Sequence, residues 1–295
     1  MRLNTLPAGM VQERAGVLFN RRVAPDHFHM RLVSPPAARR ARPGQFVHLL
    51  CPPQADSLSG KSPLLRRPLS LFDVNPRAGT VEIIYKVVGT GTATLARVQA
   101  GGRVDLLGPL GSSFEIPQGI RRAWLVGGGV GIPPLYFLAK DLLERQETRD
   151  KRQVRAFLGA RTKDWVICAS DFRRLGVQVH VATDDGTLGY KGSVVDLVGD
   201  VITRDCEAKP KQDRSNLAFY ICGPTGMMAA AAALARRRGI PAQVSLEERM
   251  GCAMGCCMGC VVEVTTEPAN SHARFQRVCT EGPVFQAQDV LWRTS

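Results

Sequence analysis

Four cysteines near the end of the chain restrict how this segment can fold. Cys252, Cys257 and Cys260 follow the spacing C-x4-C-x2-C, and Cys279 lies further along the chain. Thiols grouped this closely indicate metal or redox chemistry in a reducing compartment. If four thiolates converge on one centre, the chain between them must wrap tightly. Glycines, which adopt backbone angles that other residues resist, interrupt this loop at Gly251, Gly255 and Gly259.

The spacing C-x4-C-x2-C with one distant cysteine is typical of the plant-type ferredoxin site for a 2Fe-2S cluster. We therefore predict a cluster-binding segment over residues 241–295, with Cys252, Cys257, Cys260 and Cys279 as metal ligands. A structural zinc ion is an alternative, because four cysteines also satisfy zinc. Cys256 could replace Cys257 in another register, but the spacing favours Cys257.

The middle of the chain alternates between strand and helix patterns. This alternation favours a parallel-sheet α/β domain, which we place at residues 120–240. The expected strands are Arg121–Val126, Val154–Leu158, Val177–Ala182 and Leu217–Cys222. The expected helices are Leu135–Arg145 and Met227–Arg238, the second closed by Gly239. We expect the polar segment Asp205–Ser215 to be a surface loop.

Residues 1–119 are β-rich, with turn residues around short apolar runs, and favour a small antiparallel barrel over an open sheet. Strands are expected at Gln45–Leu50 and Val81–Val88, a polar loop at Pro52–Pro63 and a short helix at Thr94–Gln99. Two further strands, Gln243–Leu246 and Cys260–Thr265, are expected in the last segment.

A glycine-rich turn follows the first strand of the α/β domain. Its sequence, VGGGVGIPP at Val126–Pro134, is not a full dinucleotide fingerprint and alone could be an ordinary tight turn. A second strand-to-helix turn, YICGP at Tyr220–Pro224, strengthens the interpretation. Two such loops at the carboxyl edge of one parallel sheet make a crevice suited to a dinucleotide.

Two segments of the first domain offer groups for a phosphate and a flat ring. Leu65–Ser70 places a guanidinium and a hydroxyl beside a proline-stiffened strand. Gly89–Thr92 adds backbone amides and hydroxyls. Either segment taken singly could be a solvated loop.

Together these motifs resemble the ferredoxin–NADP reductase superfamily, in which a flavin-binding β-barrel precedes a nicotinamide-binding α/β domain. The order RPLS, IYKVVGTGT, GGGVGIPP and CGPTGMM carries this resemblance. The tail, SLEERMGCAMGCCMGC followed by VCTEGPVF, is similar to the electron-transfer subunits of class 1B dihydroorotate dehydrogenase. The internal segment TDDGTLGYKGSVVDLV at Thr183–Val198 also matches that subgroup.

The resemblance implies a role for individual residues. Those expected to bind FAD are Arg67, Pro68, Leu69, Ser70, Ile84, Tyr85, Lys86, Gly91 and Thr92. Those expected to bind NADH are Gly127, Gly128, Gly129, Gly131, Gly223 and Pro224. Cys222 would lie near the nicotinamide, although an inert core thiol is the alternative.

The resemblance also implies an NADH-linked flavoprotein oxidoreductase subunit. Electrons would pass between NAD(H), FAD and the 2Fe-2S cluster, to or from the FMN of a dihydroorotate dehydrogenase catalytic subunit in pyrimidine biosynthesis. The assembly implied is a heterotetramer. The flavin subunit of a sulfide dehydrogenase, a hydrogenase or a bifurcating NADH-dependent ferredoxin reductase is an alternative. NADH is preferred to NADPH by resemblance alone, since Arg161 could tolerate an extra phosphate.

The net charge of +13 favours anionic partners without choosing among them. A basic nucleic-acid-binding protein with structural zinc is the alternative from another class. Because the basic residues are spread along the chain and aromatics are few, we expect no nucleic acid partner. The richest apolar run, Ala123–Ala139, is interrupted by glycines and prolines, so we expect no membrane span. With no secretory signal recognised, a cytoplasmic location is expected.

Overall fold

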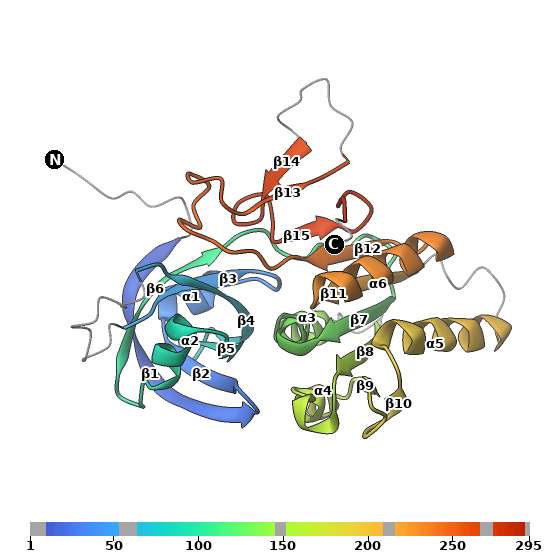
Figure 1. Ribbon diagram of the computed structural model, residues 1–295, viewed down its shortest axis with the longest axis horizontal. Helices are drawn as coiled ribbons and strands as arrows, with labels where there is room; N and C mark the ends of the chain where they lie inside the picture. The colour runs from blue at the N-terminus through green and yellow to red at the C-terminus, as the bar shows by residue number, and fades with distance from the viewer. Residues whose placement is uncertain (1–9, 53–63, 145–151, 209–215, 266–273, 293–295) are drawn as a thin grey trace.

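The computed structural model describes residues 10–52, 64–144, 152–208, 216–265 and 274–292. A β-barrel formed by the first part of the chain lies beside a mainly parallel sheet with helices on both faces (Figure 1). The cysteine-rich segment packs above the place where the two meet (Figure 1). The predicted fold class is confirmed.

The barrel is closed, with the strand order β1-β2-β5-β4-β3-β6, and every pair of neighbours is antiparallel. Alternate side chains enter its core, as the period of a strand requires; Val47 and Leu49 are completely buried. The strands are β1 (Val11–Ala24), β2 (His27–Val33), β3 (Phe46–Leu50), β4 (Arg67–Asn75), β5 (Thr80–Lys86) and β6 (Arg103–Leu110). The helices of this domain are α1 (Pro35–Arg40) and α2 (Thr90–Ala96).

The helix expected at Thr94–Gln99 is displaced, since α2 begins at Thr90 and ends at Ala96. The hydroxyl of Thr92 accepts the backbone N–H of Val88 at 2.9 Å and closes the first turn. Because this contact uses a threonine inside the helix rather than a capping residue before it, the usual sequence signal for a helix start was lacking.

The sheet of the second domain has the order β10-β9-β8-β7-β11-β12-β15. Its pairs are parallel except for β12 and β15. The strands are β7 (Arg122–Gly128), β8 (Gln153–Ala160), β9 (Gln178–Thr183), β10 (Tyr190–Lys191), β11 (Leu217–Cys222), β12 (Ala242–Ser245) and β15 (Val284–Gln286). The helical elements are η2 (Gly129–Gly131), α3 (Ile132–Glu144), η3 (Lys163–Trp165), α4 (Ala169–Arg174), α5 (Val194–Ala208) and α6 (Thr225–Arg238).

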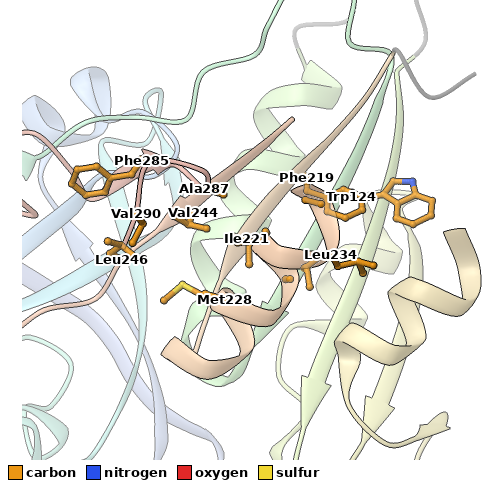
Figure 2. Close-up of a cluster of buried hydrophobic side chains, with 14 of the residues drawn as sticks. Trp124, Phe219, Ile221, Met228, Leu234, Val244, Leu246, Phe285, Ala287 and Val290 are labelled. Atoms are coloured by element: carbon orange, nitrogen blue, oxygen red, sulfur yellow. The ribbon is translucent and has the colours of Figure 1, made fainter. Parts of the chain in front are cut away.

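Two buried hydrophobic clusters cover the two faces of this sheet. On one face, α5 and α6 pack on Trp124, Phe219 and Ile221 (Figure 2). On the other, α3 and α4 pack on Leu125 and Tyr220. Because both faces are covered, all of β11 is buried, as a central parallel strand should be.

The polar segment expected as a loop at Asp205–Ser215 is partly helical. Helix α5 continues to Ala208, because apolar residues recur at helical spacing from Val194 to Ile202 and bury one face of the helix. Asp205 is held against the sheet by Arg155, whose Nη1 donates to it at 2.7 Å. The rest of that segment, and nearly all of the loop expected at Pro52–Pro63, lie outside the described residues.

The last part of the chain is attached to the sheet rather than separate from it. Strand β15 pairs with β12, and Leu246, Phe285 and Val290 enter the same cluster as Ile221 (Figure 2). The strands β13 (Val261–Glu263) and β14 (Phe275–Arg277) form a small antiparallel hairpin beside it. The domain limits near 120 and 240 stay a prediction, and β12 lies beyond the second of them.

Among the helices of the described residues, none is both long and apolar enough to cross a bilayer.

Candidate functional site

A cavity of about 770 Å³ lies between the barrel, the sheet and the cysteine-rich segment. Every barrel residue predicted to bind the flavin lines it, except Gly91. These lining residues are Arg67, Pro68, Leu69, Ser70, Ile84, Tyr85, Lys86 and Thr92. The two antiparallel strands β4 and β5 therefore bring separate sequence motifs to one wall.

Gly91 lies behind this wall, against the guanidinium of Arg67. A Cβ atom built at Gly91 would lie 2.7 Å from Nε of Arg67, so only glycine lets the guanidinium approach so closely. One Nη atom of Arg67 donates to the carbonyl oxygen of Leu65 at 2.6 Å. The rest of the guanidinium can meet a phosphate, and Leu69, Ile84 and Tyr85 offer apolar surface to a flat ring. The residues present therefore fit a flavin nucleotide.

The predicted nicotinamide-binding turns touch each other at the carboxyl edge of the sheet. A Cβ atom on Gly131 would lie 2.4 Å from the backbone of Cys222, and one on Gly223 would lie 2.9 Å from the amide nitrogen of Gly128. Gly127, the last residue but one of β7, pairs with Cys222 of β11. These glycines pack the turns together instead of lining the cavity, which Val130 and Thr225 of the same turns do line.

Cys222 is completely buried at the end of β11. Burial raises the pKa of its thiol well above the ordinary value; the charge of Glu247 adds to this, and a hydrogen bond with Ser245 opposes it. The thiol therefore stays protonated. Ser245 is also the neighbour of Cys222 on β12. The proximity of Cys222 to a nicotinamide stays a prediction.

The four predicted ligands are arranged as two pairs of thiols. The Cys252 thiol is hydrogen-bonded to Cys257 and the Cys279 thiol to Cys260, while the charge of Cys252 also acts on Cys279. Among the described residues, no three His, Cys, Asp or Glu side chains are gathered around one metal position. Two neighbouring pairs of thiols fit a centre of two irons with two thiolates each.

The backbone around Cys252 favours a thiolate. Burial acts to raise the pKa of its thiol, but hydrogen bonds from backbone N–H groups outweigh burial and lower the pKa to about 6. Two of these donors, Met254 and Cys257, lie 3.4 Å from the sulfur. Cys256 and Cys257 are both exposed, and the Cys256 Sγ is hydrogen-bonded to the carbonyl oxygen of Met254 at 3.9 Å. The register with Cys257 as ligand fits this arrangement.

Part of the cavity wall was not predicted from the sequence. The segment Leu246–Met250, together with Phe46 and Pro283, completes the lining. Leu246–Met250 belongs to the motif SLEERMGC, which contributes to the family resemblance but in which only the cysteine was predicted to bind a cofactor. It leads directly from β12 to the first predicted cluster ligand, so the cavity and the thiol pairs share one short stretch of chain.

Two family models match the chain. Residues 125–233 match the oxidoreductase NAD-binding domain. Residues 247–291 match the iron-sulfur cluster binding domain of dihydroorotate dehydrogenase B. The expected nicotinamide-binding and cluster-binding parts are thereby confirmed.

Curated relatives match almost the whole chain. The electron transfer subunit of dihydroorotate dehydrogenase B (NAD(+)) from Desulforamulus reducens is 38% identical over 92% of this chain and 94% of that protein. The protein of the same name from Geobacillus thermodenitrificans is 40% identical over 95% of this chain and 98% of that protein.

Solved structures agree with this relationship. One of an NADH-dependent reduced ferredoxin-NADP oxidoreductase, studied for flavin-based electron bifurcation, has a TM-score of 0.78 and 32% identity, covering 95% of this chain and 90% of that chain. A ferredoxin NADP+ reductase from Neisseria gonorrhoeae has a TM-score of 0.60 and 18% identity, covering 79% and 92%, and supports the fold. The chain thus belongs to the family of the electron transfer subunits of dihydroorotate dehydrogenase B.

Proposed function

We propose that this chain is an NADH-linked oxidoreductase subunit that moves electrons between NAD(H), FAD, a 2Fe-2S cluster and a catalytic partner subunit. The relatives are named as subunits of dihydroorotate dehydrogenase B, so the partner is its catalytic subunit and the pathway is pyrimidine biosynthesis. The partner carries FMN, and the assembly is a heterotetramer.

The observation that carries this proposal is the composition of the cavity wall. Flavin-motif residues such as Arg67 and Tyr85 line the same cavity as Leu246–Met250, which leads into Cys252. Val130 and Thr225 bring the two nucleotide-binding turns to that cavity as well. Three binding functions therefore meet at one place, as stepwise electron transfer over short distances requires.

The chain's own residues bind and orient the cofactors. Arg67 holds a phosphate of FAD, while Leu69 and Ile84 support the ring. Gly127–Gly131 and Cys222–Pro224 form the nicotinamide-binding edge, with Cys222 near the nicotinamide. When bound, the flavin supplies the exchange between hydride transfer and single-electron transfer. The four predicted cysteine ligands hold the cluster on the side of the partner.

An anaerobic reduction experiment tests the proposal. The purified chain, loaded with FAD, iron and sulfide, is mixed with NADH while flavin absorbance and the paramagnetic signal of the reduced cluster are followed. We expect flavin bleaching, then the cluster signal, and reoxidation by the co-expressed catalytic subunit with orotate. A chain that binds no flavin, or is not reduced by NADH, would contradict the proposal.

A second candidate is supported by the bifurcating oxidoreductase, which matches 95% of this chain with 32% identity. In that case NADP+ would replace orotate as the acceptor, and reduced ferredoxin, with a different partner subunit, would supply electrons alongside NADH. The complex of this chain with its native partner, purified from the source cells, is assayed with NADH and orotate and with NADH, reduced ferredoxin and NADP+; the pair of substrates that turns over distinguishes the two functions.

A further inference from the structure

Glu247 places a carboxyl group on the cavity wall where the flavin-binding and nicotinamide-binding parts meet. It lies two residues beyond Ser245, which neighbours Cys222 in the sheet. The backbone before it is fixed, because the N–H of Leu246 donates to the carbonyl oxygen of Pro283 at 2.9 Å. The Leu246 side chain is buried in the hydrophobic cluster (Figure 2). Glu247 is therefore held at the carboxyl edge of the sheet, where a dinucleotide is expected.

The carboxyl group of Glu247 has no hydrogen-bond or ion-pair partner among the described residues. Two cations that line the same cavity, Arg67 and Lys86, have other partners. Arg67 donates to the carbonyl oxygen of Leu65, and the ammonium of Lys86 lies 4.5 Å from the centre of the Trp165 ring. The exposed side chain of Glu247 faces the cavity rather than open solvent. Surrounding protein atoms desolvate its carboxyl group and thereby raise the pKa of Glu247.

The other charged and titratable groups around this carboxyl come from three strands and from the segment of Glu247 itself. Arg67 of β4 and Tyr85 and Lys86 of β5 line the same cavity, as do Glu248 and Arg249 of its own segment. Cys222 of β11 is close enough for the charge of Glu247 to raise the pKa of its thiol. Burial raises the pKa of the Tyr85 hydroxyl, so Tyr85 and Cys222 both keep their protons. Among these groups, Glu247 is the carboxyl whose charged form is disfavoured by burial, so it holds a proton more readily than a solvated glutamate does.

The proposed function creates a need for such a group. Oxidation of one NADH to NAD+ releases two electrons and one proton. Electrons that leave through an iron–sulfur cluster carry no proton with them, so one proton for each NADH remains in the cavity and must reach solvent. When electrons run toward NAD+, one proton must enter instead. A carboxyl group with a raised pKa exchanges a proton readily in both directions.

We propose that the Glu247 carboxylate accepts this proton at one Oε atom, releases it to solvent, and supplies a proton when the flow is reversed. The inference rests on the proposed function. Glu247 is then a proton-carrying residue of the electron-transfer reaction, separate from the residues that bind the cofactors.

The test compares the loaded wild-type protein with Glu247→Gln, whose side chain has almost the same volume and cannot carry the proton. We expect the flavin absorbance of the wild type, recorded across pH without NADH, to show a titration step that Glu247→Gln lacks. With NADH, the transfer of electrons from flavin to cluster should slow by about a hundredfold in Glu247→Gln and lose its pH dependence.

Two further variants separate this role from a structural one. Glu144→Gln, at the exposed end of α3, changes the net charge equally and should behave as the wild type. Glu247→Asp keeps a carboxyl group, so it should retain a titration step, and it provides the test if Glu247→Gln does not fold. If the variant without the carboxyl keeps the titration step and the pH dependence, the inference is overturned while the proposed function stands. If NADH does not reduce the wild type, the proposed function fails first, and this inference with it.

Discussion

The ammonium nitrogen of Lys140 on α3 lies 2.6 Å from Oδ1 of Asp73 on β4, so an ion pair joins the barrel to the nucleotide-binding domain. The same nitrogen donates to the carbonyl oxygen of Val74 at 3.2 Å. Beside this pair, the rings of Phe72 and Tyr136 stack with their centres 4.5 Å apart. Burial raises the pKa of Asp73, although the hydrogen bond and charge of Lys140 oppose the increase. The carboxylate therefore depends on its partner.

Lys140→Met keeps the apolar stem of the side chain but removes the charge, which leaves Asp73 in a poorly hydrated place without its cation. We expect the free energy of unfolding to fall by about 2 kcal/mol, measured by denaturant titration. Arg174→Ala is the control, because the Arg174 side chain is 71% exposed and pairs with Asp171 within α4. In this variant the free energy of unfolding should fall by less than about 1 kcal/mol. If the two variants lose the same free energy of unfolding, the ion pair between the domains contributes no more to stability than an exposed pair does.

Gly131→Ala should disturb the nicotinamide-binding edge. The new Cβ atom would lie 2.4 Å from the backbone of Cys222 and Gly223, which cannot move aside without displacing the turn. We expect a loss of about 2 kcal/mol in the free energy of unfolding and weaker NADH binding, followed by nicotinamide fluorescence. Gly226→Ala is a matched control, since no atom lies within 4 Å of its new Cβ in α6. Unchanged NADH binding in Gly131→Ala would separate this turn from the binding site.

Much of the fold was predictable because local patterns and tertiary contacts agree. The strand predicted at Leu217–Cys222 matches β11 residue for residue, since a central parallel strand is apolar on both faces. Gly239, predicted to close a helix, has a φ of 65° at the end of α6, where glycine is favoured. Such signals lie within a few neighbouring residues, so the sequence displays them directly.

Other features depend on contacts between distant residues. Strand β15 pairs with β12 across nearly forty residues of cysteine-rich chain, and no local pattern indicates that register. Likewise, Glu247 is an ordinary glutamate in the sequence. Its position becomes informative only when the sheet edge near Cys222 and the barrel residue Lys86 are brought around it. The predicted glycines of the turns pack against each other, whereas Val130 lines the cavity.

Cys257→Ser should abolish the cluster and leave flavin reduction by NADH intact. The structure pairs Cys257 with Cys252, and the Cys257 N–H donates to the Cys252 sulfur at 3.4 Å. A serine hydroxyl is a poor ligand for iron, so we expect iron and inorganic sulfide to fall close to zero per chain. Cys256→Ser is the neighbouring control and should retain both. The reverse result would assign the ligand role to Cys256 and shift the register by one residue.

His48 of β3 is completely buried, and within the described structure neither ring nitrogen has a hydrogen-bond partner. Burial, reinforced by the charge of Arg66, lowers its pKa from 6.5 to about 4. Because the unfolded chain binds the proton more readily, the contribution of His48 to stability is complete above pH 6.5. It is lost progressively as the pH falls toward about 4.

For the wild type we expect His48 to remove about 3 kcal/mol from the free energy of unfolding across this pH window, and His48→Leu should lack that part of the pH dependence. Above pH 6.5, His48→Leu should leave the free energy of unfolding unchanged or raise it, because neither buried ring nitrogen has a hydrogen-bond partner within the described residues. His29→Leu is the contrast: His29 is hydrogen-bonded to buried Glu82 at 2.5 Å, so its removal should destabilise at neutral pH. Denaturant titrations at both ends of the window measure these effects, and an unaltered acid dependence in His48→Leu would assign it to other groups.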